Sequence, residues 1–457
     1  MAETKIQLAV EEGPAVDVLV VGAGPAGIAA AIASARNGAK TMLIEKEGYA
    51  GGNATIGLVG PFMTSFDNEG KTQLIRGIYD ELVRRMENEG GAIHPSKIGA
   101  GTPYAAFIIP GHRNVAPFDP EVLKRAAEDM LLESKVELLF YTQFIDCIVE
   151  NKTITGIIAA KRQGLVRITP KIVIDCSGEG YVSVKAGVPV TMGRKKDNAT
   201  QPATLFCRVA GVDSGKVTKT MEESRSLMGK PFFGAFSWLI DEGRKNGDWN
   251  IDRDELGCYM APNGKIWNMN TSRISHVAGN RSESLTRASI EGRKQVIEIV
   301  KFLNKYVPGF EEAYLVDTGS AVGVRESLHI DGEYTLTRED LISCKTFEDD
   351  ILLCSNAIDI HDEDTGGGEY VTVDTWYGIP YRTLVPRNCD NLLVAGKTIS
   401  ALSEAVAGFR VMPCCYGLGQ GAGTAAAIAV KNRRKPRDID TGELQKTLIS
   451  QGVFLNK

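Results

Sequence analysis

A strand–turn–helix–strand segment near the start of the chain limits its fold more than any other feature. Residues 16–21, Val-Asp-Val-Leu-Val-Val, predict a buried strand that runs directly into Gly-Ala-Gly-Pro-Ala-Gly at residues 22–27. An Ala-rich helix to about Asn37 and a second strand at residues 41–44 then lead to Glu45. Glycines at this spacing between a strand and a helix form the βαβ fingerprint of dinucleotide-binding folds. The segment therefore predicts a doubly wound α/β domain that binds a dinucleotide.

Each motif residue has a physical reason to be there. Gly22 permits the tight turn, Gly24 lets the backbone approach a pyrophosphate, and Gly27 lets helix and strand pack closely. The free N–H groups at the helix start meet the pyrophosphate charge. Glu45 is placed to accept hydrogen bonds from the adenosine ribose hydroxyls. No other glycine-rich stretch lies between two such strands, so we expect one bound dinucleotide.

The rest of the chain predicts a discontinuous nucleotide-binding domain. Length alone favours two domains, because 457 residues exceed the size at which one core keeps growing. Apolar runs at residues 171–175 and 391–396 predict further parallel strands, and the alternating residues 136–168 predict an antiparallel meander that crosses over the sheet. We therefore assign residues 14–200 and 355–435 to the nucleotide-binding domain, residues 201–354 to an inserted α+β cap domain that shapes a substrate cavity, and residues 436–457 to a C-terminal helical tail.

Composition excludes several classes of partner. A net charge of −5, from 52 basic and 57 acidic residues, gives no general field for polyanions, so we expect no nucleic-acid partner. The first residues lack the order of a signal peptide, and glycines and Pro25 interrupt the apolar stretch from Val16, so we expect no membrane partner and a cytoplasmic location. Nine cysteines without CxxC or Cys/His spacing indicate no metal site and a reducing compartment.

These motifs resemble the glutathione-reductase-type FAD superfamily, in the branch of FAD-dependent oxidoreductases with a cap domain. That branch is similar to the fumarate reductase flavoproteins and to the tRNA-modifying flavoprotein of the glucose-inhibited-division family. The match lies in four places that span nearly the whole chain: residues 22–27 with 45–54, 175–178, 323–330 and 379–427. The resemblance implies a Rossmann-like FAD-binding sheet with a β-meander crossover.

Together, the motif and the resemblance imply which residues hold FAD. They are Gly22, Gly24, Pro25, Ala26, Gly27, Glu45, Lys46, Gly51, Gly52, Asn53, Ala54, Phe144, Cys176, Ser177, Gly178, Gly396, Lys397, Gly419 and Gln420. In this assignment Phe144 contacts the adenine, and Lys397 stands where the wider superfamily has an Asp that holds a ribityl hydroxyl. A helix that opens near Gly419 aims its positive end at the flavin. No histidine lies at residues 48–53, where related proteins attach the flavin, so we expect non-covalent FAD.

The substrate chemistry needs a proton-transfer group beside the flavin. His361, in an Asp-Ile-His segment before an acidic glycine-rich loop, is the leading candidate for a general base. Arg325 and His329 follow a glycine bend and form a second polar set. Further candidates are Tyr381, Arg382 and Arg410, because guanidinium groups clamp carboxylates. A structural role for each of these residues stays open.

The leading hypothesis is an FAD-dependent dehydrogenase or reductase that moves a hydride between flavin N5 and a small organic substrate. A tRNA-modifying flavoprotein and a flavin monooxygenase are the alternatives. We expect a small-molecule substrate, an external electron acceptor and assembly as a homo-oligomer.

Overall fold

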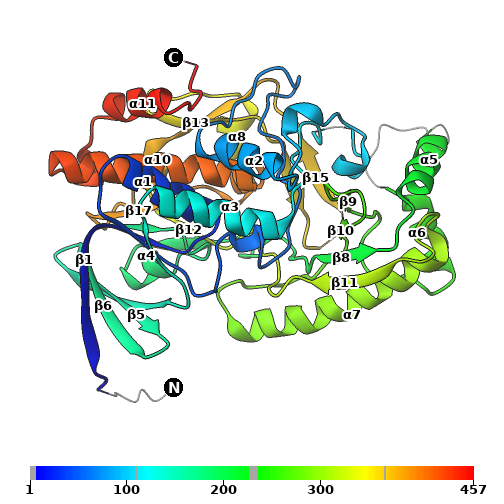
Figure 1. Cartoon of the computed structure of the whole chain (residues 1–457), viewed down its shortest axis with the longest axis horizontal. Helices are drawn as coiled ribbons and strands as arrows, with labels where there is room; N and C mark the ends of the chain where they lie inside the picture. The colour runs from blue at the N-terminus through cyan, green and yellow to red at the C-terminus, as the bar shows by residue number, and fades with distance from the viewer. Residues whose placement is uncertain (1–6, 110, 226–234, 365–366, 457) are drawn as a thin grey trace.

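The computed structural model describes residues 7–109, 111–225, 235–364 and 367–456. Figure 1 shows a parallel sheet with helices packed on it, a β-meander beside it, and a separate sheet-and-helix layer at the other end of the molecule. Among the described helices, none is long and apolar enough to cross a membrane.

Seven strands form the largest sheet of the described residues, in the order β3-β2-β1-β6-β5-β4, with β17 beside β6. They are β1 (Val10–Val21), β2 (Thr41–Ile44), β3 (Glu137–Leu139), β4 (Gln143–Glu150), β5 (Thr153–Lys161), β6 (Gly164–Asp175) and β17 (Leu392–Val394). β1 pairs in parallel with β2 and β6, and β17 pairs in parallel with β6. β5 is antiparallel to both β4 and β6. The α/β class and the β-meander crossover predicted from the sequence are confirmed.

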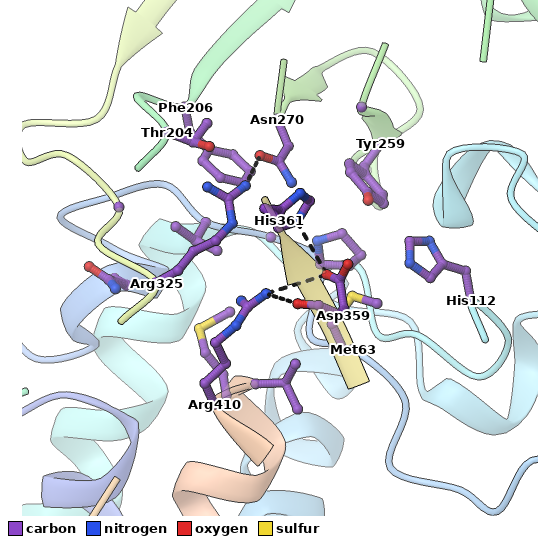
Figure 2. Close-up of a pocket in the computed structure, with 18 of the residues that line it drawn as sticks. Met63, His112, Thr204, Phe206, Tyr259, Asn270, Arg325, Asp359, His361 and Arg410 are labelled. Atoms are coloured by element: carbon purple, nitrogen blue, oxygen red, sulfur yellow. Dashed lines mark hydrogen bonds and ion pairs between the residues drawn. The ribbon is translucent and has the colours of Figure 1, made fainter. Parts of the chain in front are cut away.

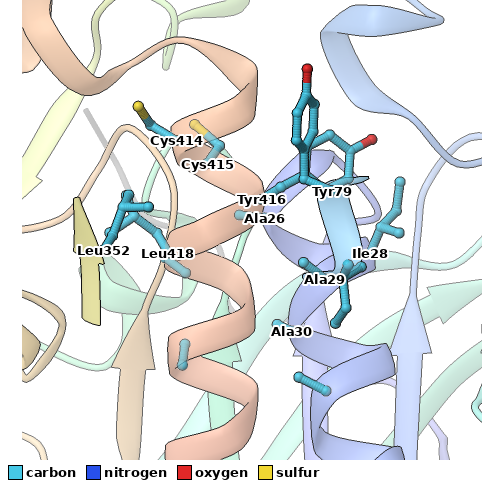
Figure 3. Packing of buried hydrophobic residues seen from close by; sticks show 14 of the residues in the cluster. Ala26, Ile28, Ala29, Ala30, Tyr79, Leu352, Cys414, Cys415, Tyr416 and Leu418 are labelled. Carbon is cyan, nitrogen blue, oxygen red and sulfur yellow. The ribbon is translucent and has the colours of Figure 1, made fainter. Parts of the chain in front are cut away.

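The helices of this part pack on its sheets or on one another. They are α1 (Pro25–Arg36), α2 (Ile78–Asn88), α3 (Pro120–Glu133), α4 (Tyr181–Lys185), α8 (Arg338–Ile342), α9 (Ser403–Phe409), α10 (Met412–Asn432) and α11 (Thr441–Ser450). Short two-stranded pairs join β7 (Val190–Met192) to β12 (Leu328–Ile330), β13 (Asp350–Cys354) to β16 (Tyr377–Pro380), and β14 (Ile358–His361) to β15 (Gly368–Val371). α1 and α10 lie side by side in the core of this layer (Figure 3).

Two glycines of α10 allow this close packing. A Cβ on Gly419 would lie 2.0 Å from the Ala26 carbonyl oxygen, and one on Gly423 would lie 2.1 Å from the Ala30 carbonyl oxygen. No side chain fits there, because a rigid backbone oxygen, and not a flexible side chain, occupies the space.

We expect Gly423→Val to lower the free energy of unfolding by about 3 kcal/mol or more, because the branched side chain must push α10 off α1. Denaturant unfolding measures the change. Gly99→Ala is the matched control, since a Cβ on Gly99 meets nothing within 4 Å. Equal stability of the two variants would contradict the packing of α10 on α1 described here.

A second core belongs to the segment between the two halves of the nucleotide-binding part. Its sheet has the order β11-β8-β10-β9. The strands are β8 (Cys207–Ala210), β9 (Cys258–Met260), β10 (Trp267–Met269) and β11 (Tyr314–Thr318). Three helices pack with this sheet: α5 (Ser214–Arg225), α6 (Ser237–Lys245) and α7 (Ser282–Tyr306). The buried residues of this core run from Ala203 to Val324, with Phe107 added, whereas Leu336 to Cys354 pack in the core of α1 and α10. The domain division stays a prediction, but packing places the end of the inserted core well before residue 354.

Candidate active site

The fingerprint motif forms one wall of an elongated cavity, here called the dinucleotide cavity. β1 ends at Val21, Gly22 takes a left-handed turn (φ +98°), and α1 begins at Pro25. No side chain caps the start of α1, where Gly24 is the N-cap residue. The first N–H groups of this helix are therefore available to an anion in the cavity.

Most of the predicted cofactor residues line this cavity. They are Gly22, Gly24, Pro25, Ala26, Glu45, Lys46, Gly52, Asn53, Cys176, Ser177, Gly178, Gly396 and Lys397. Glu45 is only 7% exposed, and its carboxylate accepts hydrogen bonds from the backbone N–H of Ala23 (2.7 Å) and Glu47 (3.0 Å). Burial raises the pKa of Glu45. Each carboxylate oxygen still has a lone pair to offer, so the predicted ribose contact stays chemically open.

Three other predicted residues, two glycines and an alanine, lie next to the residues that line the cavity. A Cβ on Gly27 would lie 1.8 Å from the Gly22 carbonyl oxygen, which is the close helix–strand contact expected of this position. The Gly51 N–H donates to the Ala23 carbonyl (2.8 Å), and the Ala54 N–H donates to the Gly51 carbonyl (3.1 Å). These residues shape the turn and do not line the cavity.

The predicted helix start near Gly419 and Gln420 is wrong. α10 begins at Met412, so both residues lie two turns inside it, where Gly419 packs on α1 and the Gln420 side chain accepts a hydrogen bond from the Ile78 N–H (3.0 Å). The positive end of α10 lies instead at Met412, which lines the dinucleotide cavity together with Cys415. Cys414 is buried behind it, with its Sγ 2.8 Å from the Sγ of Cys354.

The predicted adenine contact of Phe144 is also not supported. Phe144 lies on β4, opposite Ala159, and packs against the apolar cluster under the meander. It is not among the described residues that line the dinucleotide cavity.

A second cavity, here called the histidine cavity, adjoins the first. Five residues line both cavities: Asn53, Val324, Lys397, Arg410 and Met412. Lys397 lies at this junction, where its ammonium donates to the Val324 carbonyl (2.8 Å) and lies 3.1 Å from the Glu179 carboxylate. A molecule in the dinucleotide cavity can therefore present one end to the histidine cavity.

His361 and Arg325 both line the histidine cavity, as predicted for residues that face a substrate (Figure 2). His361 ends β14, and its Nε2 lies 3.3 Å from the Oδ2 of Asp359. The same Oδ2 lies 3.3 Å from a terminal nitrogen of Arg410. Arg325 donates to the Pro202 carbonyl and lies 3.4 Å from the Asn270 side-chain oxygen.

The charges in this cavity control the protonation of His361. Burial lowers the pKa of His361 to about 4, with a smaller contribution from the Arg325 charge, and the nearby Asp359 carboxylate only partly opposes this. Although burial alone would raise it, the pKa of Asp359 falls well below its usual range because His361, Arg410 and Arg325 stabilise the carboxylate. At neutral pH the pair is therefore a neutral imidazole beside an ionised carboxylate.

Three other predicted catalytic residues have structural roles. The His329 Nε2 lies 3.2 Å from the Glu326 carboxylate, with both side chains buried. The Tyr381 hydroxyl donates to the Pro436 carbonyl (2.9 Å), and Arg382 pairs with Asp349 at 3.0 Å. None of the three is among the described residues that line either cavity. Packing of their own elements turns these side chains elsewhere.

Asp359 and Arg253 line the histidine cavity and were not among the residues predicted from the sequence. Asp359 stands two positions before His361 in β14, and this spacing puts both side chains on one face of a strand. Arg253 comes from a loop of the inserted segment, and no sequence signal marks it. Ile108 and His112 also line the cavity. Pro110 between them is outside the described residues, as are Thr365 and Gly366 of the acidic glycine-rich loop that follows His361.

A family model for FAD dependent oxidoreductases matches residues 17–448 of the chain. The chain belongs to this family. It is therefore an FAD-dependent enzyme, as the dinucleotide cavity indicates.

Two curated relatives match parts of this oxidoreductase. The thiamine thiazole synthase of Aeropyrum pernix is 32% identical over 178 residues, which cover 36% of this chain and 56% of that protein. Digeranylgeranylglycerophospholipid reductase 3 of Methanosphaera stadtmanae is 26% identical over 256 residues, which cover 52% of this chain and 56% of that protein. The chain thus spans about half the length of the curated relatives it matches. Among solved structures, a geranylgeranyl bacteriochlorophyll reductase-like protein from Thermoplasma acidophilum has a TM-score of 0.47 and 14% identity, covering 96% of this chain and 83% of that one.

The dinucleotide cavity suits FAD on its own geometry. A Cβ on Gly24 would meet only the Gly52 Cα, at 3.9 Å, so the open side of Gly24 faces space that a phosphate group can fill. The uncapped start of α1 would hold the pyrophosphate, and Glu45 the ribose. The junction residues Asn53, Lys397 and Met412 would hold the flavin end.

We expect this oxidoreductase to release its FAD on acid precipitation, because the cysteine thiols that line the described cavity are poor nucleophiles. Burial raises the pKa of Cys415 to about 12 and that of Cys176 well above its usual range, so both cavity thiols stay protonated and weakly nucleophilic. Absorbance of the supernatant and pellet measures the release. A yellow pellet would contradict this prediction and point to one of these thiols.

Proposed function

We propose that this protein is an FAD-dependent dehydrogenase or reductase of a small organic molecule, with His361 as the group that accepts or donates the substrate proton. One observation carries the proposal: the Asp359–His361 pair lines the histidine cavity, which shares five lining residues with the dinucleotide cavity. When bound, FAD supplies two-electron acceptance or donation, and an external acceptor or donor completes the cycle.

The chain itself manages the proton. When the imidazole Nε2–H donates to the Asp359 carboxylate, the Nδ1 lone pair is free to take a proton. Asp359 holds the ring in that tautomer and stabilises the positive charge that develops on it, as the carboxylate does in other Asp–His pairs. Arg410 holds Asp359 from the other side. Asp359 and Arg410 are therefore positioning residues for His361.

The shape of the histidine cavity favours a small substrate. Its volume is about 190 Å³, which is below the roughly 300–1,000 Å³ of sites for drug-sized ligands. Phe206 and Tyr259, which are 4% and 6% exposed, line the same cavity as the charged groups. These side chains limit water around the reacting atoms and so strengthen the local electrostatic interactions.

Anaerobic bleaching of the flavin, screened over a panel of metabolites, tests this function. A dehydrogenase is bleached by its substrate without oxygen, and the reduced enzyme is then reoxidised by artificial acceptors. A reductase shows the reverse half-reaction with a chemically reduced flavin. If the reduced enzyme instead reacts with O₂ only when a substrate is bound, and the substrate gains oxygen, the protein is a flavin monooxygenase and our proposal is wrong.

A further inference from the structure

The charges that line the histidine cavity do not balance within the protein. Arg253 lies 3.4 Å from the Glu255 carboxylate, and Lys397 lies 3.1 Å from that of Glu179. The other two cations of the cavity wall, Arg325 and Arg410, share the single carboxylate of Asp359. One positive charge is left over, and an uncompensated charge in a mostly enclosed site is costly.

The surplus charge belongs to Arg325. Arg410 contacts Asp359 directly, at 3.3 Å, whereas the described hydrogen bonds of Arg325 go to the Pro202 carbonyl and the Asn270 amide oxygen, which are neutral. Burial and the neighbouring charges of Arg410 and Arg253 lower the pKa of Arg325, so the site resists this cation when nothing anionic is bound. An anion beside the guanidinium removes this penalty.

The position of Arg325 separates this anion from FAD. Arg325 lines only the histidine cavity, whereas Arg410 and Lys397 line both cavities. Negative charge on the flavin end of FAD would therefore lie nearest to Lys397, Arg410 and the start of α10. Arg325 is therefore available to bind a second molecule.

The apolar residues of the same cavity give the rest of that molecule its character. Met63, Ile108, Phe206 and Tyr259 line the same space, and Figure 2 shows the Arg325 guanidinium and the rings of Phe206 and Tyr259 around one cavity. An apolar carbon skeleton buries well against these groups, while a second charge would have no partner there.

We propose that the substrate is an organic acid in which one carboxylate, bound by Arg325, is attached to an apolar body. The planar guanidinium offers paired N–H groups that match a carboxylate. This inference rests on the proposed function, because it names the class of molecule that His361 would deprotonate or protonate.

Binding of benzoate and benzamide to the oxidised holoenzyme tests the proposal without turnover. The two probes share shape and differ in charge. Each is titrated while the flavin difference spectrum and the thermal unfolding midpoint are recorded. We expect benzoate to bind saturably, and benzamide to bind at least about tenfold more weakly, since the surplus charge of Arg325 is left without a counter-ion.

Three variants locate the effect. We expect Arg325→Gln to weaken benzoate binding by roughly 10- to 150-fold, the range for a lost hydrogen-bonded charge contact, and to leave benzamide binding unchanged. Arg325→Lys should recover part of the benzoate affinity, because a point charge replaces the fork. Arg382→Gln is the matched control: neither Arg382 nor its partner Asp349 lines either cavity, so benzoate binding should stay as in the parent enzyme.

Several results would overturn the proposal. The parent enzyme could bind benzoate and benzamide equally, or not bind benzoate at all. Arg325→Gln could lose the same affinity for both probes. Finally, a neutral compound could bleach the flavin of Arg325→Gln at the rate of the parent enzyme. The last of these would leave the proposed oxidoreductase function standing. Conversely, specific benzoate binding with no metabolite able to bleach or reoxidise the flavin would contradict the proposed function and not the anion site.

Discussion

Gly24→Val should give a folded, colourless protein. The backbone of Gly24 is extended (φ −72°, ψ −177°), so valine adopts it without strain, and its Cβ would meet only the Gly52 Cα at 3.9 Å. The added methyl groups instead enter the space where the pyrophosphate of FAD approaches the start of α1. We expect FAD affinity to fall roughly 10- to 100-fold or more, the cost of forcing bulk into a packed contact. Flavin absorbance per chain, measured after gel filtration, gives the loss.

Gly27→Val is the matched control for the fold. Its Cβ would lie 1.8 Å from the Gly22 carbonyl oxygen, so this variant should fail to fold rather than lose only its cofactor. Circular dichroism and thermal unfolding separate the two cases. About one FAD per chain retained by Gly24→Val would show that the pyrophosphate does not lie at this helix. Glu45→Arg should also lose FAD, at an added cost in stability, since Glu45 holds the Ala23 and Glu47 N–H groups.

His361→Ala should slow the bleaching of the flavin by the true substrate by about 10²–10⁴-fold, the usual effect of losing a positioned general base. The variant should keep its FAD, because His361 does not line the dinucleotide cavity. It should also keep benzoate binding, because Arg325 is intact. Stopped-flow absorbance under anaerobic conditions measures the rate. His276→Ala, at a side chain that is 75% exposed, is the matched histidine control.

The pH profile makes the role of His361 more specific. The neutral imidazole is the base, and burial lowers the pKa of His361 to about 4. The second-order rate constant of bleaching should therefore be level from about pH 7 down to pH 5, and fall as the pH drops through about 4. A base with the ordinary histidine pKa would instead lose activity near pH 6.5. Asp359→Asn should lower the bleaching rate and shift the pH at which the rate falls. If Asp359 has a purely structural role, its loss would lower the stability of the protein and leave that pH unchanged.

A rate for His361→Ala within a few-fold of the parent enzyme would reduce this residue to a structural role. The loss of FAD in that variant would instead indicate that β14 supports the cofactor cavity. The cofactor content, the bleaching rate and the pH dependence of that rate are measured separately. Loss of the cofactor can therefore be distinguished from loss of the general base.

The sequence predicts best where function depends on local backbone geometry. Gly22, Gly24 and Gly27 act within one turn and one helix start, so their spacing alone indicates the strand, the turn and the helix that the structure contains. The spacing of Asp359 and His361 is similarly local. The start of α10 also had a local signal, because Pro413 marks a first helical turn, although the later glycines drew the prediction to Gly419.

Tertiary structure alone decided which distant side chains meet. Phe144, His329, Tyr381 and Arg382 have the chemistry expected of site residues, but their contacts lie within the fold and they do not line either cavity. Arg253 has no sequence signal and lines the histidine cavity because the inserted core places its loop there. The sequence shows the chemical type of each side chain and the short spacings between neighbours. Contacts between residues far apart in the chain depend on how the helices and strands pack. The fingerprint therefore determined that a dinucleotide binds, and only the folded chain brought Arg325, Asp359, His361 and Arg410 into one cavity.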